Sequence, residues 1–318
     1  MKTTPISQNR ILKFTLGATL VLGLAAGALS YLPAQWVLPG LYSTYAWRSG
    51  VHGTTVQTPE GLIDAMEGGS PRTDRLPVLL LHGFGDSKIS FVQAAQWVTP
   101  EFQVLMPQFP GFGESPKDPK LNHSIRAQVD RVRALLDAKG WSQAHLVGNS
   151  MGGHIAAAFA LRYPERVGKL ILLSPAGLLV DDPIPYRPQT QAIATEADFD
   201  AYMGQIFHKT PWVPRPFKMD FITKAAQGFQ WLQKVRQEIR EGEDYILNDR
   251  IAEISAPTLI VWGKHDGVVR AVHAPLWKEK IRNSRLIEFE DAGHSIQYEY
   301  PERTGTLIRD ELLESTSK

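Results

Sequence analysis

The chain has 318 residues, of which 43% are hydrophobic, and its 34 basic residues almost balance its 33 acidic ones. That length fits one large α/β core with an inserted element. The balanced charge gives no electrostatic footprint for nucleic acid, which we exclude as a partner. The absence of cysteine excludes disulfides, a thiolate nucleophile and cysteine metal ligands.

The uncharged segment from Phe14 to Leu32 is about as long as a helix that crosses a bilayer. Two interpretations remain open: a retained membrane anchor, or a cleaved signal peptide with Ala26 and Ala28 as the small residues before the cut, which would leave a secreted or periplasmic protein. We favour the anchor, because the stretch is long for a signal core and leads into aromatic residues suited to a membrane interface. These residues are Tyr31, Trp36, Tyr42, Tyr45 and Trp47. More basic residues precede the segment than closely follow it, which predicts a main domain on the non-cytoplasmic side.

From about residue 55, short apolar runs alternate with segments of helical periodicity. Most of the runs are apolar on both faces, as the central strands of a helix-covered parallel sheet are. The predicted strands are LPVLLLHG, FQVLMPQF, AHLVGNS, KLILLSPAG, PTLIVWG and RLIEFE. Two helical segments between them end at Gly140 and Gly168. This βαβ series predicts an α/β fold.

The series is interrupted from about Leu179 to Asn248, where Pro, aromatic residues and short helical pieces predict a cap inserted between strands. We therefore divide the chain into four segments. Residues 1–50 form the N-terminal anchor or signal segment with its linker, 51–178 the first part of the core, 179–248 the cap, and 249–318 the second part of the core.

The stretch HLVGNSMGGH, from His145 to His154, places Ser150 between glycines directly after an apolar run. Glycines two residues before and two after a serine fit a sharp strand-to-helix turn, where larger side chains would collide. AHLVGNS supplies the strand and GGHIAAAFALRYP the helix. We therefore predict that Ser150 is a nucleophile.

A serine hydroxyl needs a base to take its proton and an acid to orient that base. In this architecture both follow in chain order, from loops at the carboxyl ends of later strands. LIVWGKHDGVV places Asp266 after one apolar strand, and LIEFEDAGHS places His294 after the next. We predict that Asp266 is the acid and His294 the base.

Other titratable residues have competing interpretations. His82, in LHGFG, is a base by type, but it precedes a glycine turn and we expect it to brace that loop. His154 should lie on the first turns of the helix after Ser150, and His265 should point away from the site. Three further aspartates are alternative acids: Asp181, Asp182 and Asp291.

As a set, the motifs LLLHGFGDS, PGFGES, GNSMGG, GKHDGVV and DAGHS resemble those of the α/β-hydrolase superfamily. The chain is most similar to membrane-anchored monoacylglycerol lipases and to Moraxella-type bacterial lipases, over roughly Leu76 to Arg303. The resemblance implies an α/β-hydrolase fold, with a mostly parallel eight-stranded sheet flanked by helices and a largely helical cap. Gln108 stands where related sequences usually have aspartate, at a position that concerns loop geometry rather than chemistry.

The resemblance also implies ester hydrolysis without a cofactor or metal. It assigns the nucleophile to Ser150, the acid to Asp266, the base to His294, and the oxyanion hole to the backbone N–H groups of Phe84 and Met151. The expected function is that of a serine carboxylester hydrolase that acts on acylglycerols through an acyl-enzyme intermediate. The expected partners are a lipid or small ester substrate and a membrane surface; the oligomeric state is not predicted.

Other functions on this scaffold remain as alternatives. They are a small-ester esterase, a perhydrolase, a carbon–carbon bond hydrolase and a non-catalytic binding protein. HGFG in place of HGGGPG disfavours the carbon–carbon hydrolases, and a serine nucleophile disfavours dehalogenases and epoxide hydrolases, which use aspartate.

The cap segment FHKTPWVPRPFKMDF sets three aromatic residues among three basic ones. The residues are Trp212, Phe217, Phe221, Lys209, Arg215 and Lys218. One interpretation is a surface that dips apolar side chains into a bilayer while basic ones meet anionic head groups. The other is that the aromatic residues pack against the core or line an acyl pocket.

Overall fold

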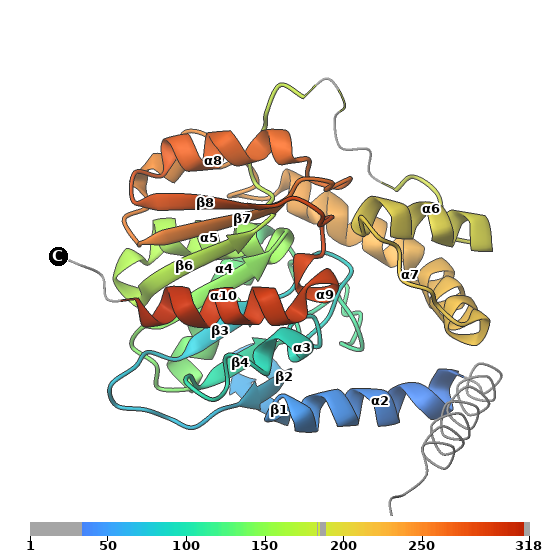
Figure 1. The fold of residues 1–318 in the computed structure, drawn as a ribbon, viewed down its shortest axis with the longest axis horizontal. Coiled ribbons are helices and arrows are strands. Elements are labelled where there is room, and N and C mark those ends of the chain that lie inside the picture. Colours follow the sequence, from blue (N-terminus) through green and yellow to red (C-terminus); the bar gives the residue numbers. More distant parts are fainter. Residues whose placement is uncertain (1–33, 183, 185–188, 315–318) are drawn as a thin grey trace, which may run out of the picture.

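The computed structural model describes residues 34–182, 184 and 189–314. In this part of the chain, eight strands form one sheet in the order β1-β2-β4-β3-β5-β6-β7-β8 (Figure 1). The strands are β1 Val51–Thr58, β2 Gly61–Gly68, β3 Val78–Leu81, β4 Val104–Pro107, β5 Ala144–Asn149, β6 Val167–Leu173, β7 Thr258–Gly263 and β8 Ser284–Phe289. From β4 to β8 the neighbours are parallel. The predicted fold class is therefore confirmed.

The described part of the chain also contains nine α-helices. They are α2 Ala34–Arg48, α3 Val92–Ala95, α4 Ile125–Ala138, α5 Met151–Arg162, α6 Glu196–Ile206, α7 Arg215–Glu241, α8 Ala274–Lys280, α9 Ile296–Glu299 and α10 Pro301–Leu313. In Figure 1, α3 and α10 cover the near face of the sheet, and α4 and α5 lie behind it. Each face has its own apolar core, because β3 and β5–β7 carry buried side chains on both sides.

The first two strands form an antiparallel hairpin that the sequence interpretation did not resolve. In β1 and β2, buried and exposed residues are mixed, as they are in strands with one face toward water. β2 then pairs antiparallel with β4 and so joins the hairpin to the parallel sheet. Such strands lack the continuous apolar run that marks the central strands of the sheet.

The predicted cap consists of α6 and α7, which lie together beyond one end of the sheet (Figure 1). The two ends of the insertion are joined by one side chain: Asn248 Oδ1 accepts from the Leu179 N–H at 2.8 Å, and Asn248 Nδ2 donates to the Leu179 carbonyl at 2.7 Å. This closure supports the division at 179 and 248, which we retain as a proposal.

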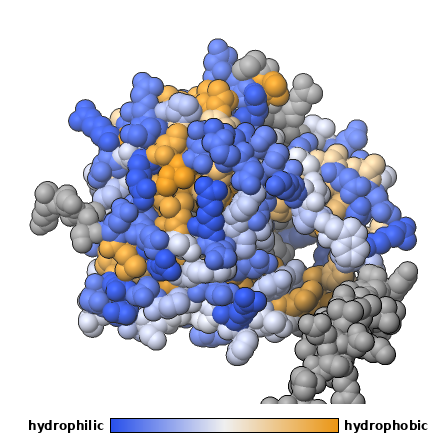
Figure 2. Space-filling model, in the orientation of Figure 1, coloured by the Kyte–Doolittle hydropathy of each residue, from blue (hydrophilic) through white to orange (hydrophobic). Residues whose placement is uncertain are grey.

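The segment predicted to anchor the chain, Phe14–Leu32, lies outside the described residues. Among the residues that are described, no helix has the length and hydrophobicity needed to span a bilayer. The first described helix, α2, packs against β1 and approaches α7. Leu41, Tyr42 and Trp47 are exposed on it. Figure 2 shows a mostly hydrophilic face with several separate hydrophobic areas, one of which lies at the end of α2 beside the grey atoms.

Two buried histidines make the stability of the fold depend on pH. Burial lowers the pKa of His145 and of His154 to about 4, against 6.5 for an unperturbed side chain. His145 Nδ1 accepts the Lys169 N–H at 3.0 Å, which requires that nitrogen to be unprotonated. His154 Nε2 lies 2.7 Å from the Asp244 carbonyl, to which it donates. Both imidazoles are therefore neutral in the folded state.

We expect the free energy of unfolding to fall as the pH falls from about 6.5 to about 4, because the unfolded chain binds more protons than the folded one in this window. At the acid end of this pH window, each histidine should account for about 3 kcal/mol of the lost free energy of unfolding. Urea denaturation at several pH values measures the slope. His154→Gln cannot titrate and should give a shallower slope; a slope as steep as that of the wild type would contradict this account.

Candidate active site

Ser150 lies at a strained turn between β5 and α5. Its backbone has a φ of 55° and a ψ of −117°, a conformation that few non-glycine residues adopt. Its N–H donates to the Leu173 carbonyl at 2.9 Å, and its own carbonyl accepts from Ala176 at 3.1 Å. The turn is thus held from β6 and from the residues that follow β6.

The glycines around Ser150 are required by close backbone contacts. A Cβ on Gly148 would lie 2.3 Å from Gly152, and a Cβ on Gly152 would lie 2.1 Å from the Leu81 carbonyl oxygen. Real Cβ atoms do not approach so closely, so β3, β5 and α5 could not pack with larger residues here. The prediction of a sharp strand-to-helix turn is confirmed.

Asp266 and His294 come together from the loops after β7 and β8. His294 Nδ1 lies 2.8 Å from Asp266 Oδ2, and both side chains are almost fully buried. The other carboxylate oxygen, Oδ1, accepts the N–H groups of Val268 and Val269 at 2.8 and 2.9 Å. These three contacts fix the carboxylate, and its Oδ2 orients the imidazole so that Nδ1 carries the proton.

Strand β5 is linked to the loop of His294 by Asn149, the residue before Ser150. Asn149 Nδ2 donates to the His294 carbonyl at 3.2 Å and to the Leu173 carbonyl at 3.1 Å. No hydrogen bond joins Ser150 Oγ to His294 within the described residues. Such contacts are often long in enzymes without substrate and tighten in the complex.

Two backbone donors next to Ser150 are free. In the described part of the chain, the N–H groups of Phe84 and Met151 donate to no protein acceptor. Met151 is the first residue of α5, where the helix leaves its N–H groups unpaired. The Phe84 loop is close, since a Cβ on Gly83 would lie 3.3 Å from Ser150 Cβ.

His82 braces the Phe84 loop, as predicted. Its Nε2 accepts the Phe109 N–H at 3.1 Å, and its Nδ1 lies 2.8 Å from the Gly83 carbonyl. Burial lowers the pKa of His82, which keeps the ring neutral. Gln108 fills the aspartate position of related sequences, and its Oε1 accepts the Lys88 N–H at 3.1 Å.

The other candidate residues have different partners. His154 lies on the first turn of α5, as expected. His265 is exposed and stacks on His208, with ring centres 3.7 Å apart, so it also lies as predicted.

The three alternative acids have other partners or surroundings. Asp182 pairs with Arg270. Asp181 is exposed, and Asp291 accepts from the Tyr300 hydroxyl through its backbone carbonyl. None of these aspartates bonds to His294.

The end of cap helix α6 holds the loops that carry Asp266 and His294. The Ile206 carbonyl accepts the His294 N–H at 2.7 Å and the Ser295 N–H at 3.3 Å. The Gln205 carbonyl accepts the Gly267 N–H at 3.2 Å. These are carbonyls that a helix end leaves without partners of its own. The cap thereby takes part in positioning both loops.

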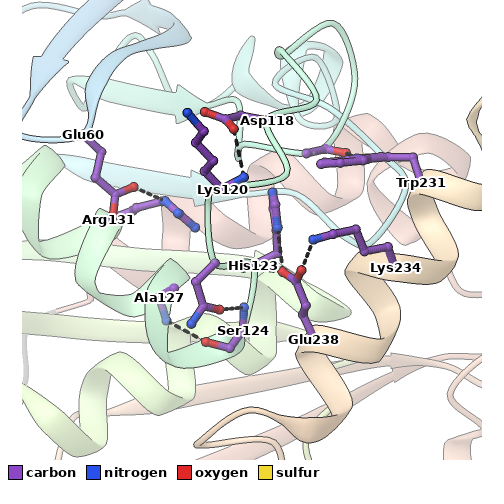
Figure 3. A network of polar contacts seen from close by, with 12 residues as sticks. Glu60, Asp118, Lys120, His123, Ser124, Ala127, Arg131, Trp231, Lys234 and Glu238 are labelled. Carbon is purple, nitrogen blue, oxygen red and sulfur yellow. Dashed lines mark hydrogen bonds and ion pairs between the residues drawn. The ribbon is translucent and has the colours of Figure 1, made fainter.

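Helix α7 is held to the core by a second set of contacts, shown in Figure 3. Glu238 accepts the His123 backbone N–H at 3.0 Å and lies 2.8 Å from His123 Nδ1, and it also pairs with Lys234. Trp231 Nε1 donates to the Gly111 carbonyl at 2.8 Å, and its ring lies edge-on to His123. His123 is fully buried, and burial lowers its pKa. These contacts tie α7 to the loop before α4.

The structure corrects one interpretation of the cap surface. Lys218 Nζ lies 2.7 Å from Asp200 and 3.8 Å from Glu196, and its side chain is only 16% exposed. It is therefore paired within the cap, which disfavours, of the two interpretations, the one in which Lys218 meets anionic head groups. Trp212 is 80% exposed, whereas Phe221 packs edge-on against Phe199.

A buried hydrogen-bond network behind the site was not predicted. Gln297 Nε2 donates to Asn149 Oδ1 at 3.2 Å and to Ser90 Oγ at 3.1 Å. Ser90 Oγ in turn donates to Asp86 at 2.7 Å, as does the Tyr298 hydroxyl at 3.0 Å. Asn149 belongs to the GNSMGG motif, but no pattern in the sequence marks Gln297. Among the described residues, no cluster of His, Cys, Asp or Glu forms a metal site.

The model of the alpha/beta hydrolase fold family matches residues 77–301. Lipase 1 of Psychrobacter immobilis is 32% identical over 69% of this chain and 71% of its own. Monoacylglycerol lipase ABHD6 of Mus musculus is 27% identical over 74% of this chain and 75% of its own. The crystal structure of a membrane phospholipase A, a bacterial virulence factor, has a TM-score of 0.79 at 29% identity and covers 95% of this chain and 99% of its own.

The chain therefore belongs to the α/β-hydrolase family, as its motifs predicted. The prediction of an enzyme of the ester-hydrolase class is confirmed with it.

Proposed function

We propose that this protein is a serine carboxylester hydrolase that cleaves acylglycerols, with Ser150 as nucleophile, His294 as base and Asp266 as acid. The observation that carries the proposal is the Asp266–His294 hydrogen bond of 2.8 Å beside the strained turn at Ser150. The free N–H groups of Phe84 and Met151 support an oxyanion hole at the same place.

In the proposed mechanism, Ser150 Oγ attacks the carbonyl carbon while His294 Nε2 takes its proton. Asp266 holds the imidazolium in place, and the Phe84 and Met151 N–H groups bind the negative oxygen. The ester C–O bond then breaks, the alcohol leaves with the proton from His294, and an acyl-serine remains. A water molecule gives its proton to His294, attacks the acyl carbonyl, and releases the fatty acid and the free serine.

Lipids are the favoured substrate class for two reasons. The relatives and the structural neighbour carry the names of lipases and a phospholipase. The described surface also exposes large apolar side chains on α2 and the cap, among them Trp47 and Trp212. We propose that residues 14–32 anchor the enzyme in a membrane, with the domain on the non-cytoplasmic side.

A substrate panel tests this function. We expect the enzyme to hydrolyse monoacylglycerols with a larger kcat/KM than p-nitrophenyl acetate, because each buried methylene adds about 0.8 kcal/mol of binding. Diacylglycerols, triacylglycerols and a carbon–carbon hydrolase substrate complete the panel. A preference for short esters would indicate an esterase, and turnover of the carbon–carbon substrate alone would contradict ester hydrolysis.

A further inference from the structure

The cap places a cation against the loop of the proposed oxyanion hole. Arg236 lies on α7, and its guanidinium carbon is 5.0 Å from the centre of the Phe84 ring. Phe84 also packs edge-on against Phe112, at 5.2 Å between ring centres, so its ring is held from two sides. Arg236 therefore lies against the side chain of the residue whose backbone N–H is a proposed oxyanion donor.

The protein contacts of Arg236 do not neutralise its charge. Its Nη1 donates to the Gln189 carbonyl at 3.1 Å and to Gln233 Oε1 at 3.0 Å, and both acceptors are neutral. Gln233 Nε2 donates to the same carbonyl at 2.7 Å, which fixes its amide orientation. The nearby Glu238 is engaged with His123 and Lys234. Among the described residues, no carboxylate forms an ion pair with Arg236.

Part of the guanidinium is open to a ligand. Arg236 is half-buried, and its Nε and Nη2 donate to no acceptor among the described residues. Other arginines of the described chain whose head groups are partly covered, such as Arg131 and Arg270, are paired with carboxylates. A guanidinium with free donors beside an aromatic ring suits bidentate binding of a phosphate or carboxylate.

We propose that Arg236 is a specificity residue that binds a phosphate group carried by the substrate, on the glycerol side of the acyl ester. This inference rests on the proposed function, because it requires an acylglycerol as the substrate. Such a substrate carries a negative charge near its ester when a phosphate is attached to its glycerol. The enzyme therefore prefers phosphate-bearing monoacyl lipids to neutral monoacylglycerols of the same chain.

A matched pair of substrates tests the proposal: monooleoylglycerol and the same molecule with a phosphate on glycerol, each in mixed detergent micelles. We expect Arg236→Gln to lower kcat/KM for the phosphate-bearing lipid about 10- to 100-fold, mainly through KM, because a charge-assisted hydrogen bond is lost. Its kcat/KM for monooleoylglycerol should change by less than about threefold. Arg236→Lys should retain part of the preference.

Arg240→Gln is the matched control, since Arg240 lies one turn further along α7 and is exposed. It should leave the hydrolysis of both lipids unchanged. An equal loss on both lipids in Arg236→Gln would show that Arg236 acts through the packing of Phe84, and would overturn the proposal. An unchanged preference of Arg236→Gln for the phosphate-bearing lipid would also overturn the proposal.

Calorimetric binding of dodecyl phosphate separates this proposal from the proposed function, because it requires no turnover. We expect Arg236→Gln to weaken that binding about tenfold or more and Arg240→Gln to leave it unchanged. Arg236-dependent binding of inorganic phosphate with the same affinity would assign the site to free phosphate and contradict a lipid ligand. A wild-type enzyme that binds dodecyl phosphate through Arg236 but hydrolyses no ester would contradict the proposed function alone.

Discussion

Ser150→Ala is expected to abolish ester hydrolysis while leaving the fold intact. The substitution removes the attacking oxygen, and what remains is substrate binding and the oxyanion hole, so kcat should fall to less than about a thousandth of the wild-type value. Because Ser150 Oγ makes no hydrogen bond within the described residues, its loss costs little stability. Steady-state kinetics measures the first effect, and thermal melting with circular dichroism measures the second.

Ser174→Ala is the matched control for this variant. Ser174 also has a positive φ, of 43°, and follows β6 beside the site. Its Oγ is buried and has no hydrogen-bond partner among the described residues, so removing it should change neither turnover nor melting temperature by much. Substantial turnover by Ser150→Ala would assign the nucleophile to another residue.

Asp266→Asn is expected to lower kcat by about 10⁴-fold, with a smaller change in KM. Asp266 Oδ1 accepts two backbone N–H groups, so the asparagine oxygen should take its place and turn the amide N–H₂ toward His294. His294 Nδ1 must then accept, and its proton moves to Nε2. The ring can no longer accept the proton of Ser150.

Asp182→Asn and Asp291→Asn are the controls for the acid. Asp182 pairs with Arg270 and Asp291 lies near the surface, so we expect each variant to retain turnover within about tenfold. Kinetics of the three variants on one ester give the ranking. A larger loss in Asp182→Asn than in Asp266→Asn would move the acid to the loop after β6.

Much of the fold could be predicted because the central strands have no polar face. The run Val78–Leu81 is buried throughout, and so is Thr258–Gly263, and such runs have few alternatives to the middle of a helix-covered sheet. The hairpin β1–β2 was less evident, because buried and exposed residues are mixed in both strands. The turn at Ser150 was predictable because close backbone contacts restrict its neighbours to glycine.

The contacts between the cap and the core could not be predicted in the same way. The Ile206 carbonyl binds the His294 N–H across a large distance in sequence, and a backbone carbonyl carries no residue signature. Lys218 was interpreted as a surface cation because its partners, Glu196 and Asp200, lie on another helix. Arg236 showed no motif either; only its position over Phe84 marks it.

Labelling with a fluorophosphonate tests whether Ser150 forms a covalent acyl-enzyme, as we propose. The probe phosphonylates an activated serine hydroxyl and releases fluoride, so the intact mass rises by one adduct and peptide mapping identifies the site. We expect a single adduct on Ser150, blocked in Ser150→Ala and strongly slowed in Asp266→Asn. A wild-type protein that stays unlabelled, or an adduct on any other residue, would contradict it.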